Sequence, residues 1–135
     1  MTELFQIKGL DHLVLRVRHL QPMLAFYQQL GCSLERVEAE QGLYQLRAGA
    51  QLIDLVPVDQ PLGAAGGAAP GVTGRNLEHF CLQIQPFDPA AIQAWCQAQQ
   101  IPCSPVAERY GSLGFGPSLY IQDPEGNSIE LKAGG

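Results

Sequence analysis

Apolar residues follow two periods along this chain, and the two periods alternate in the same order twice. An alternating, strand-like run covers residues 10–17, and residues 22–30 then carry apolar positions at helical spacing. Gly31 is expected to end that helix, because glycine readily takes the left-handed conformation that closes a last turn. Three shorter strand-like runs follow, at residues 34–37, 43–47 and 51–58. The first half is therefore predicted to fold in the order βαβββ.

The second half repeats this order. A strand is predicted over Glu78 to Ile84, and a helix begins at Pro89, where Asp88 can cap the free N–H groups of the first turn. Further strands are expected near residues 106–109, 118–122 and 128–132, and residues 123–127 form the hairpin turn between the last two. A proline stands ten residues after a histidine in each half, at Pro22 and Pro89, where each helix is expected to start.

The stretch between the halves differs in composition. Residues 61–74 are dominated by glycine, alanine and proline and show no apolar period, which predicts a mobile loop. The chain is therefore expected to form one domain over residues 5–135. Its two modules, 8–58 and 76–133, are joined by the linker 59–75.

Composition excludes several classes of partner. The net charge is −5 and charged clusters are short, so neither a nucleic-acid backbone nor an anionic membrane is an expected partner. No apolar run reaches the length of a transmembrane helix, and residues 1–5 lack the features of a secretion signal. The four cysteines show no CxxC spacing, which favours reduced thiols. The expected location is the cytoplasm.

Each half also carries a histidine on its first strand and a carboxylate on its last: His12 and Asp54, then His79 and Glu130. Strand alternation places three of the four on the more polar face, which is expected to line a cavity, whereas Asp54 shares its face with apolar neighbours. Burying an unpaired carboxylate costs several kcal/mol, so something must compensate for Asp54. Two imidazoles and two carboxylates suit a divalent cation.

The motifs around these residues resemble those of the vicinal oxygen chelate superfamily, which includes glyoxalase I, fosfomycin-resistance and bleomycin-resistance proteins, and extradiol dioxygenases. The resemblance rests on Leu10-Asp11-His12, Phe26 to Gly31, Leu77-Glu78-His79 and, most specifically, Tyr120 to Leu131. It implies an α+β fold in which two tandem βαβββ modules form a cleft of curved mixed sheet. It also implies that His12, Asp54, His79 and Glu130 bind one divalent metal ion (Zn, Ni, Fe or Mn) that chelates vicinal oxygens of a small substrate.

Some positions depart from individual members of that family. Glyoxalase I usually has Glu where this chain has Asp54, so Asp54 is either the fourth ligand or a base beside the metal. Three ligands, His12, His79 and Glu130, would instead favour Fe(II) and oxygen chemistry. Val14 stands where fosfomycin-resistance enzymes carry Thr, which argues against fosfomycin transfer. Bleomycin-binding relatives lack metal ligands, so four retained candidates argue against pure sequestration.

Three further residues are candidates for substrate contact. Tyr120 is expected to point toward Glu130, with its hydroxyl available to a substrate oxygen, and Glu130 and Asp54 are the candidate bases. Residues 111–116 are expected to form a glycine-rich turn between strands. The resemblance suggests that this turn closes over the substrate, with Arg109 meeting a carboxylate or phosphate. Strand register places Arg16 on the face that is expected to line the cavity.

The sequence leaves two functions open. One is a metal-dependent enzyme, either a lyase or isomerase or an extradiol-type dioxygenase. The alternative is a binding protein that sequesters a small molecule in the same cleft. Neither the substrate nor the metal can be read from the residues. A homodimer is expected, because such modules leave sheet edges that pair between chains, with or without exchange of modules.

Overall fold

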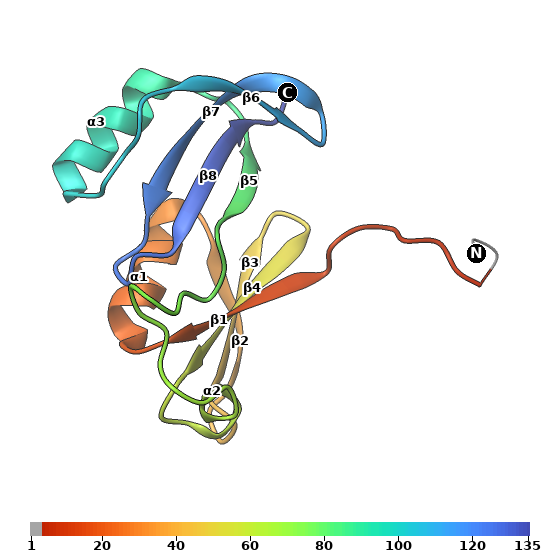
Figure 1. Ribbon diagram of the computed structural model, residues 1–135, viewed down its shortest axis with the longest axis vertical. Helices are drawn as coiled ribbons and strands as arrows, with labels where there is room; N and C mark the ends of the chain where they lie inside the picture. Colours follow the sequence, from red (N-terminus) through yellow and green to blue (C-terminus); the bar gives the residue numbers. More distant parts are fainter. Residues whose placement is uncertain (1–3) are drawn as a thin grey trace. The chain divides into compact units, whose positions relative to one another are not determined.

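The computed structural model describes residues 4–135, so part of the segment tested for a secretion signal, residues 1–3, lies outside the described range. The chain divides into two compact units, Met1–Ala69 and Pro70–Gly135. Each unit holds one four-stranded mixed sheet and one long helix, in the predicted order βαβββ (Figure 1). The prediction of an α+β fold with two tandem modules is confirmed.

The first unit builds its sheet in the order β1-β4-β3-β2. Strands β1 and β4 pair in parallel, and the other neighbours pair antiparallel. The elements are β1 (His12–Val17), α1 (Leu20–Leu30), β2 (Ser33–Glu38), β3 (Leu43–Ala48), β4 (Gln51–Pro57) and the short helix α2 (Pro61–Ala64).

The second unit repeats that topology with the order β5-β8-β7-β6, in which β5 and β8 are the parallel pair. Its elements are β5 (Phe80–Ile84), α3 (Pro89–Gln99), β6 (Ala107–Gly111), β7 (Gly114–Gln122) and β8 (Ser128–Ala133). His79 therefore stands one residue before β5, not inside a strand as predicted.

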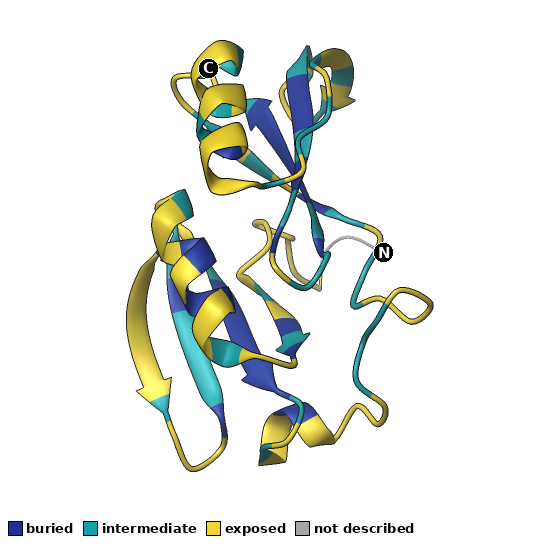
Figure 2. Ribbon diagram, turned by 90° about the vertical axis from the view of Figure 1, so that its left-hand side faces the viewer, coloured by how far each residue is buried: buried dark blue, intermediate teal, exposed yellow. Residues whose placement is uncertain are grey.

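Each unit has its own apolar core on one face of its sheet. In the first unit, α1 contacts β2 and β4, and Tyr27 and Met23 from the helix are fully buried, as are Leu15 and Leu55 from the sheet. In the second unit, Leu119, Ile121 and Ile129 from the sheet are fully buried. Figure 2 shows buried residues on helices and strands of the chain, whereas β2 is exposed along most of its length. The strand alternation that predicted the apolar faces is confirmed.

The helix ends agree with the capping chemistry more closely at α3 than at α1. Asp88 accepts a hydrogen bond from the backbone N–H of Ala91 at 3.1 Å, with Pro89 as the first helical residue. Gly31 ends α1 with φ of 122°, as predicted. However, α1 begins at Leu20, two residues before Pro22. Proline is compatible with this position, because the first turn of a helix has no backbone acceptor for its missing N–H.

Two segments predicted as loops contain regular structure. Residues 61–64 form α2, so the stretch after Asp59 is not wholly irregular. Within residues 111–116, Gly114 and Gly116 belong to β7 and pair with Gly111 and Arg109 of β6. The glycine-rich stretch is thus a tight hairpin between two strands, and its closing over a substrate stays a prediction. Across residues 4–135, no helix is long and apolar enough to cross a membrane.

Candidate metal centre

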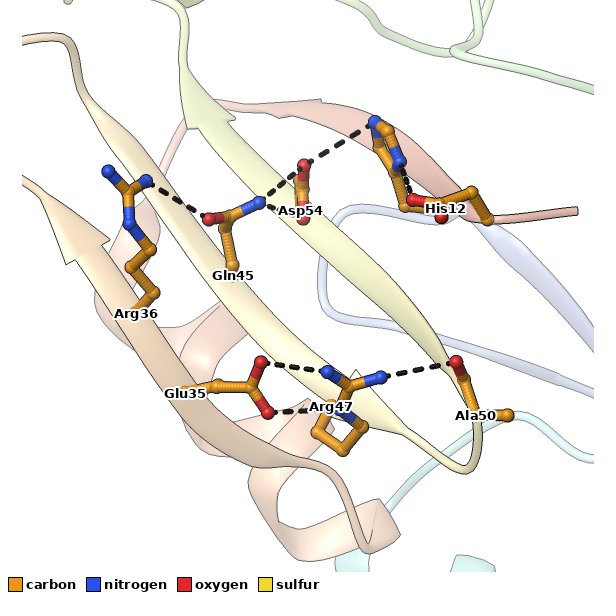
Figure 3. Close-up of polar contacts among 8 residues, drawn as sticks. His12, Glu35, Arg36, Gln45, Arg47, Ala50 and Asp54 are labelled. Carbon is orange, nitrogen blue, oxygen red and sulfur yellow. Dashed lines mark hydrogen bonds and ion pairs between the residues drawn. The ribbon is translucent and has the colours of Figure 1, made fainter.

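In the first unit, β1 and β4 bring His12 next to Asp54. Nε2 of His12 lies 4.0 Å from Oδ2 of Asp54, and Nδ1 of His12 donates a hydrogen bond to Oδ1 of Asp11 at 2.7 Å. A carboxylate can only accept, so Nδ1 carries a proton, and in the neutral ring the lone pair of Nε2 then faces Asp54. Figure 3 shows this arrangement, with the His12 ring turned toward Asp54.

The second unit contains the same arrangement. Nε2 of His79 lies 3.3 Å from Oε1 of Glu130, and Nδ1 of His79 donates to Oε1 of Glu78 at 2.6 Å. An acidic residue immediately before each histidine thus holds its ring by Nδ1. Metal-binding histidines commonly donate their second ring N–H to a carboxylate in this way, which fixes the tautomer and the orientation of the ring.

Strand register explains why both units position these side chains alike. In the parallel pair β1–β4, Asp54 lies opposite Val14, two residues after His12. In β5–β8, Glu130 lies opposite Cys81, two residues after His79. The offset is identical, so in each unit the imidazole reaches diagonally across the sheet to the carboxylate on the same face.

The neighbouring antiparallel strands extend each pair into a row. Gln45 lies opposite Asp54, and its Nε2 donates to both carboxylate oxygens at 3.3 Å. Nη1 of Arg36 in turn donates to Oε1 of Gln45 at 3.2 Å. Figure 3 shows the whole row, His12–Asp54–Gln45–Arg36, across the sheet of the first unit.

The corresponding row of the second unit is His79–Glu130–Tyr120–Arg109. Tyr120 lies opposite Glu130 on the neighbouring strand. The Tyr120 ring packs edge-on against the His79 ring, with centroids 5.2 Å apart, and the Arg109 guanidinium lies 4.7 Å from the centre of the Tyr120 ring. The predicted neighbourhood of Tyr120 and Glu130 is therefore present in the structure.

Charge is concentrated on buried atoms in both rows. Asp54 is 3% exposed and Glu130 is 7% exposed. The hydrogen bond to Asp11 and the negative charge of Asp54 raise the pKa of the His12 imidazole. Burial and the Glu130 carboxylate raise the pKa of the Tyr120 hydroxyl. These buried carboxylates are partly compensated by neutral donors, and a cation would complete the compensation.

The donor atoms fit a divalent metal in type and in spacing. Imidazole nitrogen and carboxylate oxygen both bind Zn, Ni, Fe and Mn. Two ligands at about 2.0–2.1 Å from one zinc ion stand about 3.0–3.4 Å apart, and the His79–Glu130 separation of 3.3 Å lies in that range. The 4.0 Å gap between His12 and Asp54 is longer, as expected from the shorter aspartate side chain. Within residues 4–135 no cluster of three or more candidate ligands occurs, and each unit brings together its own histidine–carboxylate pair.

Arg16 and Arg109, the predicted substrate contacts, both donate hydrogen bonds to the protein itself. The Arg16 guanidinium donates to three backbone carbonyls: Nε to Gly63 at 2.8 Å, Nη1 to Ala68 at 2.9 Å and Nη2 to Gly67 at 2.7 Å. It thereby anchors the segment that follows α2, and a substrate contact for Arg16 stays a prediction. Nη1 of Arg109 donates to the carbonyl and the hydroxyl of Ser118, at 2.9 and 3.0 Å.

Two pockets of the second unit lie away from its candidate ligands. A pocket of about 160 Å³ is lined by residues such as Arg75, Asn76 and Asn127. Another, of about 450 Å³, is lined by residues such as Cys96 and Cys103. Neither includes His79 or Glu130.

Sequence reasoning missed three residues that hold the candidate ligands in place: Asp11, Glu78 and Gln45. A signal for the first two was present, because an acidic residue precedes the histidine in both halves. Gln45 carried no such signal, since only the pairing of β3 with β4 shows that it faces Asp54.

Comparison with known proteins gives one consistent family. The model of the Glyoxalase/Bleomycin resistance protein/Dioxygenase superfamily matches residues 9–131. A glyoxalase domain-containing protein of Mycosarcoma maydis is 30% identical over 129 residues, which is 94% of this chain and 69% of that protein.

Solved structures agree with this family in fold. The structure of the virulence protein STM3117 from Salmonella typhimurium superposes with a TM-score of 0.75 and 27% identity, covering 96% of this chain and 98% of the other. That of lactoylglutathione lyase from Agrobacterium tumefaciens gives 0.63 and 25% identity, covering 95% of each chain. The chain belongs to the Glyoxalase/Bleomycin resistance protein/Dioxygenase superfamily.

Proposed function

We propose that this protein is a metal-dependent enzyme in which His12, His79 and Glu130 bind one divalent cation, with Asp54 as fourth ligand or as a base beside it. The observation that carries the proposal is the repeated histidine–carboxylate pair. In each pair, the acidic residue immediately before the histidine holds the ring through Nδ1, so that Nε2 points toward a buried carboxylate. The proposal requires one pair from each unit to reach the same cation, within one chain or between two chains.

The proposed substrate is a small organic molecule with oxygens on adjacent carbons, because the superfamily includes enzymes that chelate such oxygens. A bound divalent cation supplies Lewis-acid polarisation of those oxygens. The four side chains leave coordination positions for the substrate, and their combined charge neutralises a divalent ion. The proposed reaction is a lyase or isomerase step, with extradiol-type oxygen chemistry as the variant for a three-ligand Fe(II) site.

The chain's own residues would move the proton. A carboxylate oxygen of Glu130 or Asp54 accepts the proton from the substrate carbon, since both are buried and lie beside the proposed ligands. Tyr120 donates its hydroxyl hydrogen bond to a substrate oxygen. The same burial and neighbouring negative charge that raise its pKa keep it protonated at neutral pH.

The test is the metal content of protein purified without added metal, followed by loading with Zn(II), Ni(II), Fe(II) and Mn(II) in turn. We expect about one ion per chain, lost in His79→Ala and in His12→Ala while the circular dichroism spectrum is retained. His19→Ala is the matched control, because His19 is exposed and belongs to neither pair. Wild-type metal content in both His12→Ala and His79→Ala would overturn the proposal and favour sequestration of a small molecule without metal.

We further propose a cytoplasmic homodimer. Each sheet leaves two edge strands, β1 and β2 in the first unit and β5 and β6 in the second, and such edges are commonly covered by a second chain. All four cysteines lie in the described range and none forms a disulfide, which suits a reducing compartment. Sedimentation of the metal-loaded protein as a monomer at micromolar concentration would count against the dimer.

A further inference from the structure

Lys132 is a buried cation at a position that is apolar in the first unit. It is 5% exposed and lies on β8, two residues beyond Glu130 and on the same sheet face. The matching position in the first unit, two residues beyond Asp54 on β4, is Val56, which is 4% exposed. A lysine that is buried so fully loses the hydration of its ammonium group, which costs free energy unless another group compensates.

The protein compensates this ammonium only in part. Nζ of Lys132 donates to the carbonyl of Gly114 at 3.1 Å. Among the described residues, no carboxylate forms an ion pair with Lys132, and none does so with Arg109. An ammonium has three N–H donors, so two remain for another acceptor.

Glycines of the β6–β7 hairpin make room for the lysine side chain. A Cβ added at Gly111 would stand 2.9 Å from Cε of Lys132, and one added at Gly116 would stand 2.9 Å from Nζ. Both contacts are closer than real Cβ atoms tolerate. The lysine therefore lies across a hairpin surface that is free of side chains, and its ammonium lies over Gly116.

Arg109 lies beside this ammonium on the adjacent strand. It is the register partner of Gly116, and Lys132 is the partner of Ser118, whose hydroxyl and carbonyl accept hydrogen bonds from Nη1 of Arg109. That leaves Nε and Nη2 of Arg109 with no bond to the described residues. Two cations with free donors thus flank Ser118 and Gly116 on one sheet face, in a chain whose net charge is −5.

We propose that Lys132 and Arg109 form a binding subsite for an anionic oxygen group, a carboxylate or a phosphate, on a small molecule. Such groups accept several charge-assisted hydrogen bonds and suit a lysine beside an arginine. That this group belongs to the enzyme's substrate rests on the proposed function; the subsite itself rests on the second unit alone. Two residues along a strand span about 6.6–6.8 Å, so the substrate would carry its anionic group about that far from the oxygens held near Glu130.

The chain offers a sharp test, because Lys8 and Lys132 are its only two lysines. Protein made with ¹³C-labelled lysine should give two Hε–Cε signals, one from each. With inorganic phosphate as probe, the Lys132 signal should shift and saturate. The exposed Lys8 should respond only as it does to sodium chloride of equal ionic strength. No shift of Lys132, or equal unsaturated shifts of both signals, would overturn the proposal.

Variants supply the second measurement, followed through the backbone amide signals of Gly114 and Gly116. Lys132→Met keeps an unbranched side chain of similar length, and we expect it to weaken phosphate binding about tenfold, as does Arg109→Met. Lys8→Met and Arg75→Met are matched controls, each removing an exposed cation, and should bind as wild type. Wild-type affinity in Lys132→Met would contradict the proposal.

The two proposals fail separately in this design. Titrations are run on chelator-treated protein and on protein loaded with Zn(II). Saturable phosphate binding in chelated protein, together with wild-type metal content in the histidine variants, would leave the anion subsite standing without the metal centre. Stoichiometric metal binding without a response of the Lys132 signal to phosphate would leave the metal centre standing without the anion subsite.

Discussion

Replacing Arg16 by methionine should destabilise the first unit without any change at the candidate ligands. The guanidinium of Arg16 links β1 to the three carbonyls of residues 63, 67 and 68, and methionine retains most of the apolar stem while removing every donor. The perturbation therefore isolates the hydrogen bonds from the packing of the side chain.

The magnitude follows from the burial of each bond. The bond from Nε to the Gly63 carbonyl is partly buried, so its loss costs about 1–1.5 kcal/mol. The bonds to Gly67 and Ala68 are exposed, and water can replace the lost donor, so each is worth about 0.5–1 kcal/mol. We expect Arg16→Met to lower the free energy of unfolding by about 2–3.5 kcal/mol.

Equilibrium urea denaturation measures this loss, with an unchanged denaturant slope showing that the unfolding transition itself is the same. Arg75→Met, which removes an exposed arginine, is the control and should change the free energy of unfolding by less than about 0.5 kcal/mol. A wild-type free energy of unfolding for Arg16→Met would refute the anchoring role and would favour the predicted contact of Arg16 with substrate.

Three further outcomes test other parts of the structure. Asp123, which is 4% exposed, accepts hydrogen bonds from two backbone amides and from the Asn127 side chain. Asp123→Ala should therefore lower the free energy of unfolding, measured by urea denaturation, by roughly 3–4 kcal/mol. A loss below about 1 kcal/mol would contradict this role of Asp123 in the turn. The hydrogen bonds from Arg47 lower the pKa of Glu35 (Figure 3), so this pair adds stability above the carboxyl pKa of the unfolded chain and loses it as pH falls through the lower folded pKa. The stability difference between wild type and Arg47→Met should therefore shrink between about pH 6 and pH 3, and a constant difference would argue against the pair. Cys96 is 1% exposed, and burial raises the pKa of its thiol to about 12. A disulfide reagent should therefore label Cys96 only after the protein unfolds. Rapid labelling of Cys96 in the native protein would be inconsistent with this burial.

Strand alternation and capping residues predicted much of this fold because they act locally. The alternation around Leu15 and Ile129 placed both core faces correctly, and Asp88 marked the start of α3. The partners of the ligands were harder to predict, because they depend on strand register. Nothing near Gln45 in the sequence indicates that it lies opposite Asp54, and nothing near Gly116 indicates that it gives space to Lys132.

The segment after Asp59 was hard to predict for a similar reason, because its structure depends on contacts that are distant in sequence. Composition suggested a mobile stretch after Asp59, but a long-range hydrogen bond from Arg16 to Gly63 holds the segment that contains α2. Glycines at 111, 114 and 116 indicated a turn between strands, and the pairing of β6 with β7 extends up to Gly111 and Gly114. In the segment after Asp59, by contrast, a contact that is distant in sequence decided the local structure.

The most direct test of the metal centre is X-ray absorption spectroscopy of the protein loaded with one equivalent of Zn(II). The account predicts two imidazoles at about 2.0–2.1 Å, with oxygen ligands completing the site, and the loss of one imidazole in His79→Ala. A first shell without imidazole, or one that contains thiolate sulfur at about 2.3 Å, would contradict the pairing of His12 and His79 on one cation.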